Sequence, residues 1–277
     1  MTFANINGNN IHYQYTDNQS DTTFIFINSL GTDFRIWDGV VDILKSQGNV
    51  LRYDKAGHGL SSDLRFSDFR HTSTEIVSGT PPDRTSKIEN YVNDVIGLMD
   101  YLNIKKAVIV GLSIGGIIAQ YLAVHHAERV ERLILSNTAP KVGSEAGWNT
   151  RIETVKKDGI ASISDNIMKV WFSENFRNNR KTELLGYKSM LSNTNPEGYI
   201  QACEALKIND LTDDISKINL PTLCIAGTED GSTPPAQVKA MADLIPNSRY
   251  ILIEGVGHIP CVEVPELIAE HILKFTK

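Results

Sequence analysis

The sequence predicts an α/β fold in which helices flank a mostly parallel sheet. Three observations lead to this prediction: short apolar runs recur along the chain, helical segments separate them, and most runs are continuously apolar rather than alternating. A continuous run of Val, Ile and Leu indicates a strand that is covered on both faces, as in parallel sheets. Alternation of such strands with helices is typical of an α/β sheet.

The individual elements can be placed in chain order. The opening segment NGNNIHYQYT alternates its side chains and has turn residues at 8–10, which predicts an antiparallel hairpin beside the parallel strands. Residues 86–103 repeat apolar side chains at helical spacing, which predicts a helix. Apolar runs predict the parallel strands at residues 23–28, 49–54, 107–113, 132–137, 222–227 and 249–255.

The alternation of strands and helices is interrupted once. Residues 145–209 contain several amphipathic helical segments and no strand-like run, and Pro221 precedes the next strand. We therefore expect one core made of residues 1–140 and 210–277, with a helical cap of residues 141–209 over one end of the sheet.

A second unusual segment precedes the first predicted helix. Residues 62–84 are polar, include Pro81 and Pro82, and show no clear periodicity. Loops of this length are commonly functional, such as lids and binding loops. We expect this segment to lie near the mouth of the site.

Composition excludes several classes of function. The chain has 277 residues, of which 41% are apolar and 22% charged, with a net charge of −6. An acidic chain without a basic tract is not expected to bind nucleic acid, and no apolar run has the roughly 18 residues of a membrane helix. Without a signal peptide, a cytoplasmic location is expected. Because Cys203, Cys224 and Cys261 lack metal-ligand spacing, we expect neither a disulfide framework nor a metal site.

The strongest motif lies at the end of the apolar run at residues 107–113. Ligands of open parallel sheets bind beyond the carboxyl ends of the strands, so the loops there carry the candidate chemistry. The segment G-L-S-I-G at 111–115 joins a predicted strand to a predicted helix. Glycines two residues before and after Ser113 permit a sharp, strained turn that exposes the hydroxyl at a helix N-terminus. We therefore predict that Ser113 is a nucleophile, which needs a general base.

The sequence offers one base and two acids for this serine. His258 follows the last predicted strand in the glycine-flanked loop G-V-G-H-I-P, where it can accept the serine proton. The loop after the preceding strand, G-T-E-D-G, contains Glu229 and Asp230. We select Asp230 for its shorter side chain, three residues past the glycine, and expect Glu229 to face solvent. The predicted catalytic triad is Ser113, Asp230 and His258, in the chain order Ser, Asp, His.

An oxyanion hole requires two backbone N–H donors that point at the developing negative charge. We expect one from Ile114, directly after the nucleophile, and one from Leu30, in the loop after the first parallel strand. Gly31 allows a close approach of that loop. The sequence contains no phosphate-binding, dinucleotide-binding or catalytic-zinc motif, so no cofactor is expected.

These motifs resemble those of the α/β-hydrolase superfamily over essentially the whole chain. Besides the nucleophile turn, D-K-A-G-H-G-L-S at 54–61 is similar to the superfamily's D-x-x-G-x-G-x-S turn. The resemblance implies an eight-stranded, mostly parallel sheet with the helical cap inserted after the sixth strand. Within the superfamily, the loop N-S-L-G at 28–31 and the cap segments at 171–172 and 203–205 resemble the 3-oxoadipate enol-lactonase family.

The resemblance implies a carboxylic ester hydrolase that opens a small enol-lactone, 3-oxoadipate enol-lactone, to 3-oxoadipate through an acyl-enzyme. The acetate arm of this substrate requires a cation or several donors. Arg151 in the cap is the candidate cation, and the alternatives are Lys141, Arg177 and Arg180. The candidate substrate contacts are Ser29, Trp148, Arg151 and Trp171.

The sequence departs from the family pattern in two places. Residues 62–84 form a longer loop, and Ile114 stands where methionine is common. A carboxylesterase, a carbon–carbon bond hydrolase or a cofactor-free perhydrolase would keep the same three catalytic residues. A receptor of the hydrolase fold, which repositions its cap on a protein partner, is a further alternative. Apart from that alternative, the only partner expected is a small lactone or ester, and a homo-oligomer is compatible with the sequence.

Overall fold

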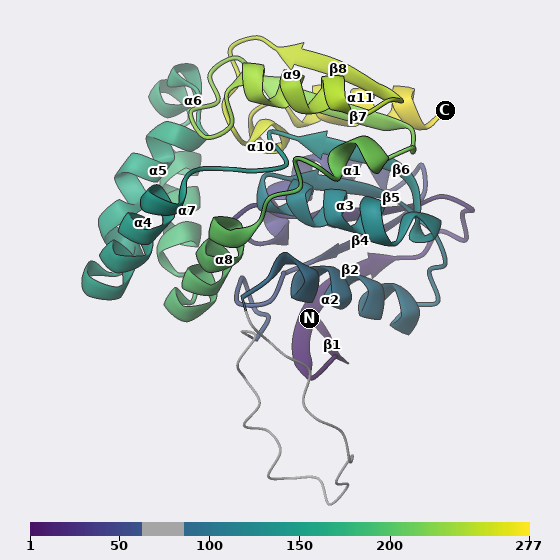
Figure 1. The fold of residues 1–277 in the computed structure, drawn as a ribbon, viewed down its shortest axis with the longest axis horizontal. Helices are drawn as coiled ribbons and strands as arrows, with labels where there is room; N and C mark the ends of the chain where they lie inside the picture. The colour runs from purple at the N-terminus through teal and green to yellow at the C-terminus, as the bar shows by residue number, and fades with distance from the viewer. Residues whose placement is uncertain (63–85) are drawn as a thin grey trace, which may run out of the picture.

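The computed structural model describes residues 1–62 and 86–277, and an eight-stranded sheet forms its centre (Figure 1). The strands lie in the order β1-β2-β4-β3-β5-β6-β7-β8. Their bounds are β1 Thr2–Ile6, β2 Asn9–Thr16, β3 Thr23–Ile27, β4 Asn49–Tyr53, β5 Ala107–Leu112, β6 Val130–Ser136, β7 Thr222–Gly227 and β8 Ser248–Ile253. The predicted eight-stranded, mostly parallel sheet is confirmed. The predicted loop 62–84 lies outside the described residues, apart from Ser62.

The N-terminal hairpin joins β1 to β2 through a turn at Asn7 and Gly8. Both residues have a positive φ, 51° and 84°, as in the tight two-residue turns of hairpins. The predicted turn at residues 8–10 is therefore displaced, because β2 already begins at Asn9, which pairs with Ile6. β2 also pairs antiparallel with β4, which attaches the hairpin to the parallel strands.

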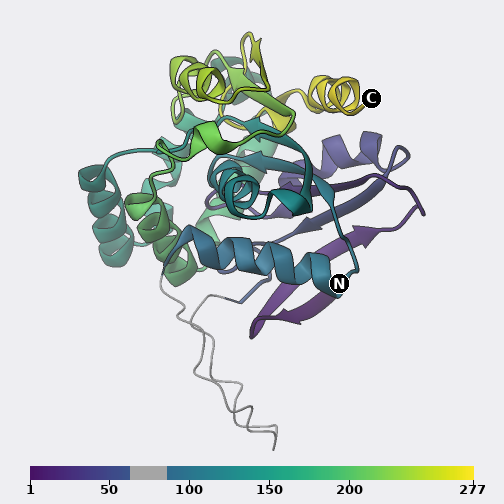
Figure 2. The same cartoon turned by 45° about the vertical axis from the view of Figure 1, so that its right-hand side comes forward.

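Helices cover both faces of the sheet. Every residue of β3, β5 and β7 is buried, which explains their continuously apolar sequences. One face carries α1 Asp38–Leu44 and α11 Pro265–Thr276, and the other carries α2 Ile88–Tyr101, α3 Ile114–His125 and α9 Pro235–Leu244 (Figure 2). The short helix α10 Pro260–Glu263 precedes α11. None of the described helices has both the length and the apolar character needed to cross a bilayer.

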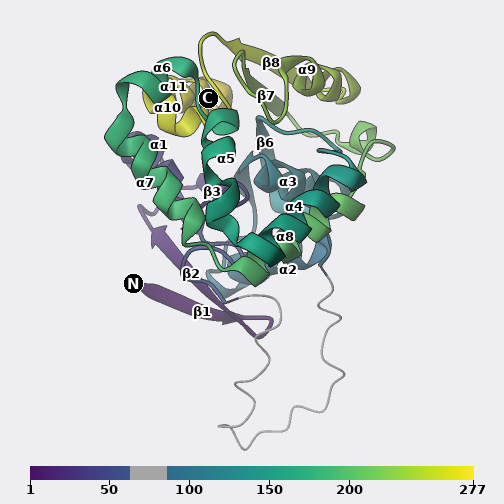
Figure 3. The ribbon, with the colours of Figure 1, turned by 90° about the vertical axis from the view of Figure 1, so that its left-hand side faces the viewer.

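The segment between β6 and β7 forms a layer of helices, which lie in front of the sheet in the view of Figure 3. They are α4 Glu145–Asp158, α5 Ser164–Trp171, α6 Glu174–Asn179, α7 Lys181–Ser192 and α8 Pro196–Ile208. The Ser144 and Asn195 side chains cap the N-termini of α4 and α8 by accepting backbone N–H groups. Helices thus occupy the place after the sixth strand where a cap is expected, while the domain division at residues 141–209 stays a prediction.

Gly57 and Gly198 bring the cap into close contact with the core. A Cβ added at Gly57 would lie 2.5 Å from the Cα of Gly198, and Gly57 has a φ of +75°. We expect Gly57→Ala to lower the free energy of unfolding by about 2 to 4 kcal/mol, through backbone strain and steric overlap.

The matched control for this change is Gly159→Ala. Gly159 has the same φ of +75°, but no described atom lies within 4 Å of its added Cβ. Its ψ of 167° places it in a region that glycine alone adopts, so its substitution should cost only backbone strain, about 1 to 3 kcal/mol. Urea unfolding of both variants measures the difference, and a loss for Gly57→Ala no larger than that for Gly159→Ala would show that the added Cβ is accommodated beside Gly198 without cost.

Candidate active site

Ser113 lies between the end of β5 and the start of α3. Its backbone has φ 57° and ψ −119°, a strained conformation that few L residues adopt. The glycines around it make this turn sterically feasible, because a Cβ at Gly111 would overlap Gly115 and lie 2.7 Å from the Cα of Gly116. The N-terminus of α3 favours negative charge on the group that it faces. The structure thus places Ser113 where the sequence predicts a nucleophile.

His258 and Asp230 are in direct contact. Nδ1 of His258 lies 3.0 Å from Oδ1 and 2.9 Å from Oδ2 of Asp230, and both side chains are buried. Burial acts to raise the pKa of the Asp230 carboxyl, but His258 and hydrogen bonds from Thr233 outweigh it, so this pKa lies below its ordinary value. The ionised carboxylate can therefore orient the ring with Nε2 free to act as a base. Glu229 is exposed, and its Oε2 accepts the N–H of Glu174 at 2.8 Å.

Asn137 and Thr233 hold the Asp230 carboxylate, a role that sequence reasoning missed. Thr233 donates to it through Oγ1 at 2.7 Å and through its N–H at 2.9 Å. Asn137 Nδ2 donates to Oδ2 at 2.9 Å and to the carbonyl of Gly257 at 3.2 Å, so it links the acid to the histidine loop. The signals available in the sequence were a threonine three residues after the acid and an asparagine directly after the sixth strand.

The nucleophile follows β5 and the acid follows β7, the two strands on either side of β6. Ser113 N–H donates to the carbonyl of Ser136 at 3.1 Å, and Asn137 N–H donates to that of Ile225 at 2.8 Å. The ends of β5, β6 and β7 are therefore in register at one edge of the sheet. Within residues 1–62 and 86–277, the Ser113 hydroxyl makes no hydrogen bond with His258 or any other group. Asp230 and His258 are thus in contact, whereas the Ser113 hydroxyl has no hydrogen-bond partner among the described residues.

Two backbone N–H groups near Ser113, in buried residues, also lack a hydrogen-bond partner among the residues that the structure describes. The loop after β3 touches the start of α3, because a Cβ at Gly115 would overlap the carbonyl of Ile27. Leu30 is 6% exposed and Ile114 is 0% exposed, yet no described residue accepts a hydrogen bond from either N–H. Buried backbone donors without a partner are rare in folded proteins. The two groups are therefore suited to bind an anionic oxygen.

Trp171 connects the histidine to the loop that carries Leu30. Its carbonyl accepts the N–H of His258 at 2.8 Å, and its ring atom Cη2 would lie 3.6 Å from a Cβ at Gly31. Tyr199 reaches the same glycine from α8, with Cε2 3.1 Å from that Cβ. Ser29 is buried in the same loop. The cap therefore places two aromatic rings directly against the candidate oxyanion loop.

Arg151 belongs to α4, and its charge lies near Tyr199 and Cys203 of α8 in the cap. Its guanidinium is 5.2 Å from the centre of the Trp148 ring, within cation–π distance. The indole N–H of Trp148 donates to the carbonyl of Val142 at 2.8 Å. Burial raises the pKa of Tyr199, and the nearby charge of Arg151 acts in the opposite direction. Arg151 forms no salt bridge with a carboxylate in the part of the chain that the structure describes.

The other candidate cations have partners elsewhere. Lys141 pairs with Asp210 at 2.8 Å on the surface. Arg180 forms a salt bridge with Glu183 and also donates to two backbone carbonyls. Arg177 donates through Nε to a backbone carbonyl at 3.1 Å. Among these four candidates, Arg151 is therefore the one that contacts aromatic residues of the cap and has no ionic partner in residues 1–62 and 86–277.

The three cysteines are buried and unpaired. Burial raises the pKa of each thiol, so Cys203, Cys224 and Cys261 stay protonated and pack as small apolar side chains. Over the described ranges, no group of three or more His, Cys, Asp or Glu side chains is arranged to hold a metal ion.

Comparisons with known proteins agree with this geometry. The profile of the family described as alpha/beta hydrolase fold matches residues 22–265. The chain is 32% identical to 3-oxoadipate enol-lactonase 1 of Acinetobacter baylyi, over 100% of this chain and 97% of that protein. The crystal structure of the enol-lactonase from Burkholderia xenovorans has a TM-score of 0.88 and 31% identity, with 99% of both chains covered. A pimeloyl acyl-carrier protein methyl ester esterase of Vibrio vulnificus is 22% identical over 96% of this chain and 97% of that protein.

Proposed function

This chain belongs to the alpha/beta hydrolase fold family, and we propose that it is a serine hydrolase that opens a small enol-lactone bearing a carboxylate. Membership of the family agrees with the resemblance that the nucleophile turn and the D-x-x-G-x-G-x-S turn indicate. The proposed substrate is 3-oxoadipate enol-lactone, the compound in the names of two similar proteins from Acinetobacter baylyi. The product is then 3-oxoadipate.

The proposed reaction passes through an acyl-enzyme. Ser113 Oγ attacks the lactone carbonyl while His258 accepts its proton, and the N–H groups of Leu30 and Ile114 bind the oxyanion. The ring C–O bond then breaks, and the enol oxygen takes the proton from His258 and tautomerises to a ketone on the acyl chain. Water attacks the acyl carbon as His258 accepts its proton. The serine oxygen leaves with that proton, and 3-oxoadipate dissociates.

The observation that carries the choice of substrate is the position of Arg151. A carboxylate that leaves water needs a local positive charge, and the chain as a whole has a net charge of −6. Arg151 lies against Trp148 and near Tyr199, and the Tyr199 ring touches Gly31 beside the candidate oxyanion loop. This series of contacts supports a cation for the acetate arm on one side of the reacting carbonyl group.

The test is a comparison of rates on the wild-type protein. Enzymatically generated 3-oxoadipate enol-lactone is followed by its ultraviolet absorbance, and p-nitrophenyl acetate is hydrolysed in parallel. We expect kcat/KM for the lactone to be at least about 10-fold higher, because only the lactone gains a charge-assisted contact in the cap. A higher kcat/KM for the simple ester would favour a carboxylesterase. A single slow turnover that leaves a persistent covalent label would favour a receptor.

Arg151→Met tests the contact with the carboxylate. We expect kcat/KM for 3-oxoadipate enol-lactone to fall about 10- to 100-fold, the effect of losing a charge-assisted hydrogen bond of about 1.5 to 3 kcal/mol. α-Angelica lactone has the same ring with a methyl group in place of the acetate arm, and its kcat/KM should stay within about twofold. Arg177→Met is the matched control and should change neither rate. Equal losses on both lactones would mean that Arg151 supports the cap and does not bind the arm.

A further inference from the structure

A buried lysine lies behind the loop that carries Leu30. Lys55 follows β4 in the glycine turn and is 1% exposed. Its Nζ donates to the carbonyl of Ser29 at 2.5 Å. In the described part of the chain, this carbonyl is the one hydrogen-bond acceptor of the lysine. Because lysine is almost never fully buried without a partner, this contact accounts for the position of the side chain.

The carbonyl of Ser29 and the N–H of Leu30 belong to the same peptide group. In a trans peptide the C=O and the N–H point in opposite directions, and the described residues contain no cis peptide bond. A donor that fixes the carbonyl on one side therefore fixes the direction of the Leu30 N–H on the other. Further bonds reach the same carbonyl, from Thr32 Oγ1 at 2.9 Å, Thr32 N–H at 3.4 Å and Asn28 Nδ2 at 3.4 Å.

We propose that Lys55 is a positioning residue that holds the peptide between Ser29 and Leu30, so that its N–H completes the oxyanion hole. This inference rests on the proposed serine mechanism. Donors of an oxyanion hole are effective when they are fixed in place before the reaction. A hydrogen bond to the back of a peptide also polarises it, which makes the N–H at the front a stronger donor.

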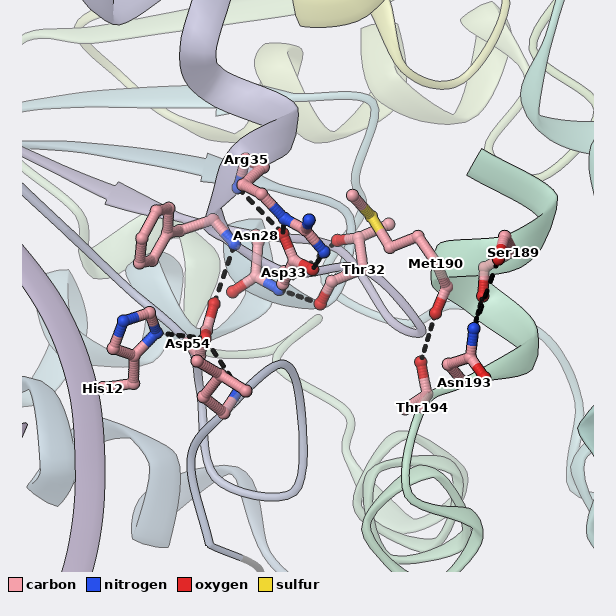
Figure 4. A network of polar contacts seen from close by, with 12 residues as sticks. His12, Asn28, Thr32, Asp33, Arg35, Asp54, Ser189, Met190, Asn193 and Thr194 are labelled. Atoms are coloured by element: carbon pink, nitrogen blue, oxygen red, sulfur yellow. Dashed lines mark hydrogen bonds and ion pairs between the residues drawn. The ribbon is translucent and has the colours of Figure 1, made fainter. Parts of the chain in front are cut away.

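The turn that carries Lys55 is itself firmly held. Asp54 accepts the N–H of Phe34 at 2.9 Å and contacts Nδ1 of His12 at 2.8 Å. Figure 4 shows the Asp54 carboxylate between His12 and the loop after β3. Phe34 follows the same loop that contains Ser29. The Asp54 carboxylate therefore fixes the backbone next to Lys55. It also fixes the far end, at Phe34, of the loop whose Ser29 carbonyl Lys55 binds.

The contact does not depend on the charge of the lysine. Burial lowers the pKa of Lys55 well below its ordinary value, and the charges of Asp54 and Asp33 act against this shift. Both the ammonium and the neutral amine have N–H groups that donate hydrogen bonds. Lys55 therefore holds the carbonyl of Ser29 in either protonation state.

Lys55→Met tests this role, because it removes the donor and keeps an apolar stem of similar length. We expect kcat for p-nitrophenyl acetate to fall about 10- to 100-fold, less than the 100- to 1,000-fold effect of deleting an oxyanion donor. KM should stay within about threefold, because the hole acts mainly in the transition state. Lys45→Met, at a lysine whose side chain is 54% exposed, is the matched control and should leave both constants unchanged.

Binding of phenylboronic acid separates positioning from a general effect on the fold. The boronate forms a tetrahedral anionic adduct with the serine nucleophile, so one of its oxygens occupies the oxyanion hole. We expect the affinity for phenylboronic acid to fall by the same factor as kcat in Lys55→Met. A folded variant with unchanged kcat, or with a lower kcat and unchanged boronate affinity, would overturn the proposal.

Thr32→Val is a second variant. If Lys55→Met does not fold, it tests whether donors to the Ser29 carbonyl position the Leu30 N–H. It removes one side-chain donor from the same carbonyl, and it should lower kcat and boronate affinity together by about 3- to 10-fold, the effect of one hydrogen bond of about 1 kcal/mol. Unchanged values in folded Thr32→Val would overturn the proposal.

The ester substrate keeps this test separate from the substrate proposal. Wild-type protein that hydrolyses p-nitrophenyl acetate but not the lactone would disprove the proposed substrate and leave the comparison of the Lys55 variant intact. If Ser113→Ala kept its esterase activity, the serine mechanism would be wrong and the inference on Lys55 would be wrong with it.

Discussion

Ser113→Ala should lower kcat/KM for the lactone and for p-nitrophenyl acetate by at least about 10,000-fold, with no loss of stability. The hydroxyl is the proposed nucleophile, and without it no acyl-enzyme can form. The fold should tolerate the change because this hydroxyl makes no hydrogen bond among the described residues. Alanine also keeps the Cβ that the backbone at φ 57° already accommodates.

Steady-state rates and urea unfolding measure the two parts of this prediction. A fluorophosphonate reagent is the control, because it should label the wild-type protein and not Ser113→Ala. A folded variant that keeps more than about one-hundredth of the wild-type activity would assign the nucleophile to another residue.

Asp230→Asn should lower kcat by about 10,000-fold. The carboxylate accepts the Nδ1–H of His258, whereas an amide presents its own NH₂ group to the ring. The ring then carries its proton on Nε2 and cannot accept the proton of the serine. We also expect a loss of about 1 to 3 kcal/mol in the free energy of unfolding, because Thr233 and Asn137 donate to the same carboxylate.

Glu229→Gln is the matched control for the acid. Glu229 stands next to Asp230, but its side chain is exposed and accepts a backbone N–H of the cap. Its substitution should change kcat by no more than about threefold. If Glu229→Gln removed activity and Asp230→Asn retained it, Glu229 would be the acid of the triad.

The inner parallel strands could be predicted from the sequence because both of their faces are buried. Every residue of β5, for example, is covered, so the strand must be apolar throughout. The hairpin turn was less predictable, because residues 7–10 are all Asn or Gly and each suits a turn. Only the pairing of Asn9 with Ile6 fixes its position. β6 likewise begins at Val130, before its apolar run, because Val130 pairs with Ala107 of β5.

The candidate triad could be predicted because each member follows a parallel strand, and such strands end at one edge of a sheet. The contacts that support the triad could not be predicted, because Asn137 and Thr233 contact Asp230 only after separate loops come together in the fold. The glycine-turn motif likewise contains no signal for the direction of the Lys55 amine. The sequence alone could not favour Arg151 over Lys141, Arg177 and Arg180 as the cation for the substrate carboxylate. The choice required the contacts of each side chain in the structure.

The most direct test of the proposed function is the ratio of kcat/KM for two lactones on the wild-type protein. 3-Oxoadipate enol-lactone and α-angelica lactone share the reacting ring and differ in the acetate arm. If the chain is a hydrolase of a carboxylate-bearing enol-lactone, the ratio should be about 10 to 100 in favour of the charged lactone. A ratio of about one or less would contradict the proposed function, because the arm would then add nothing to catalysis.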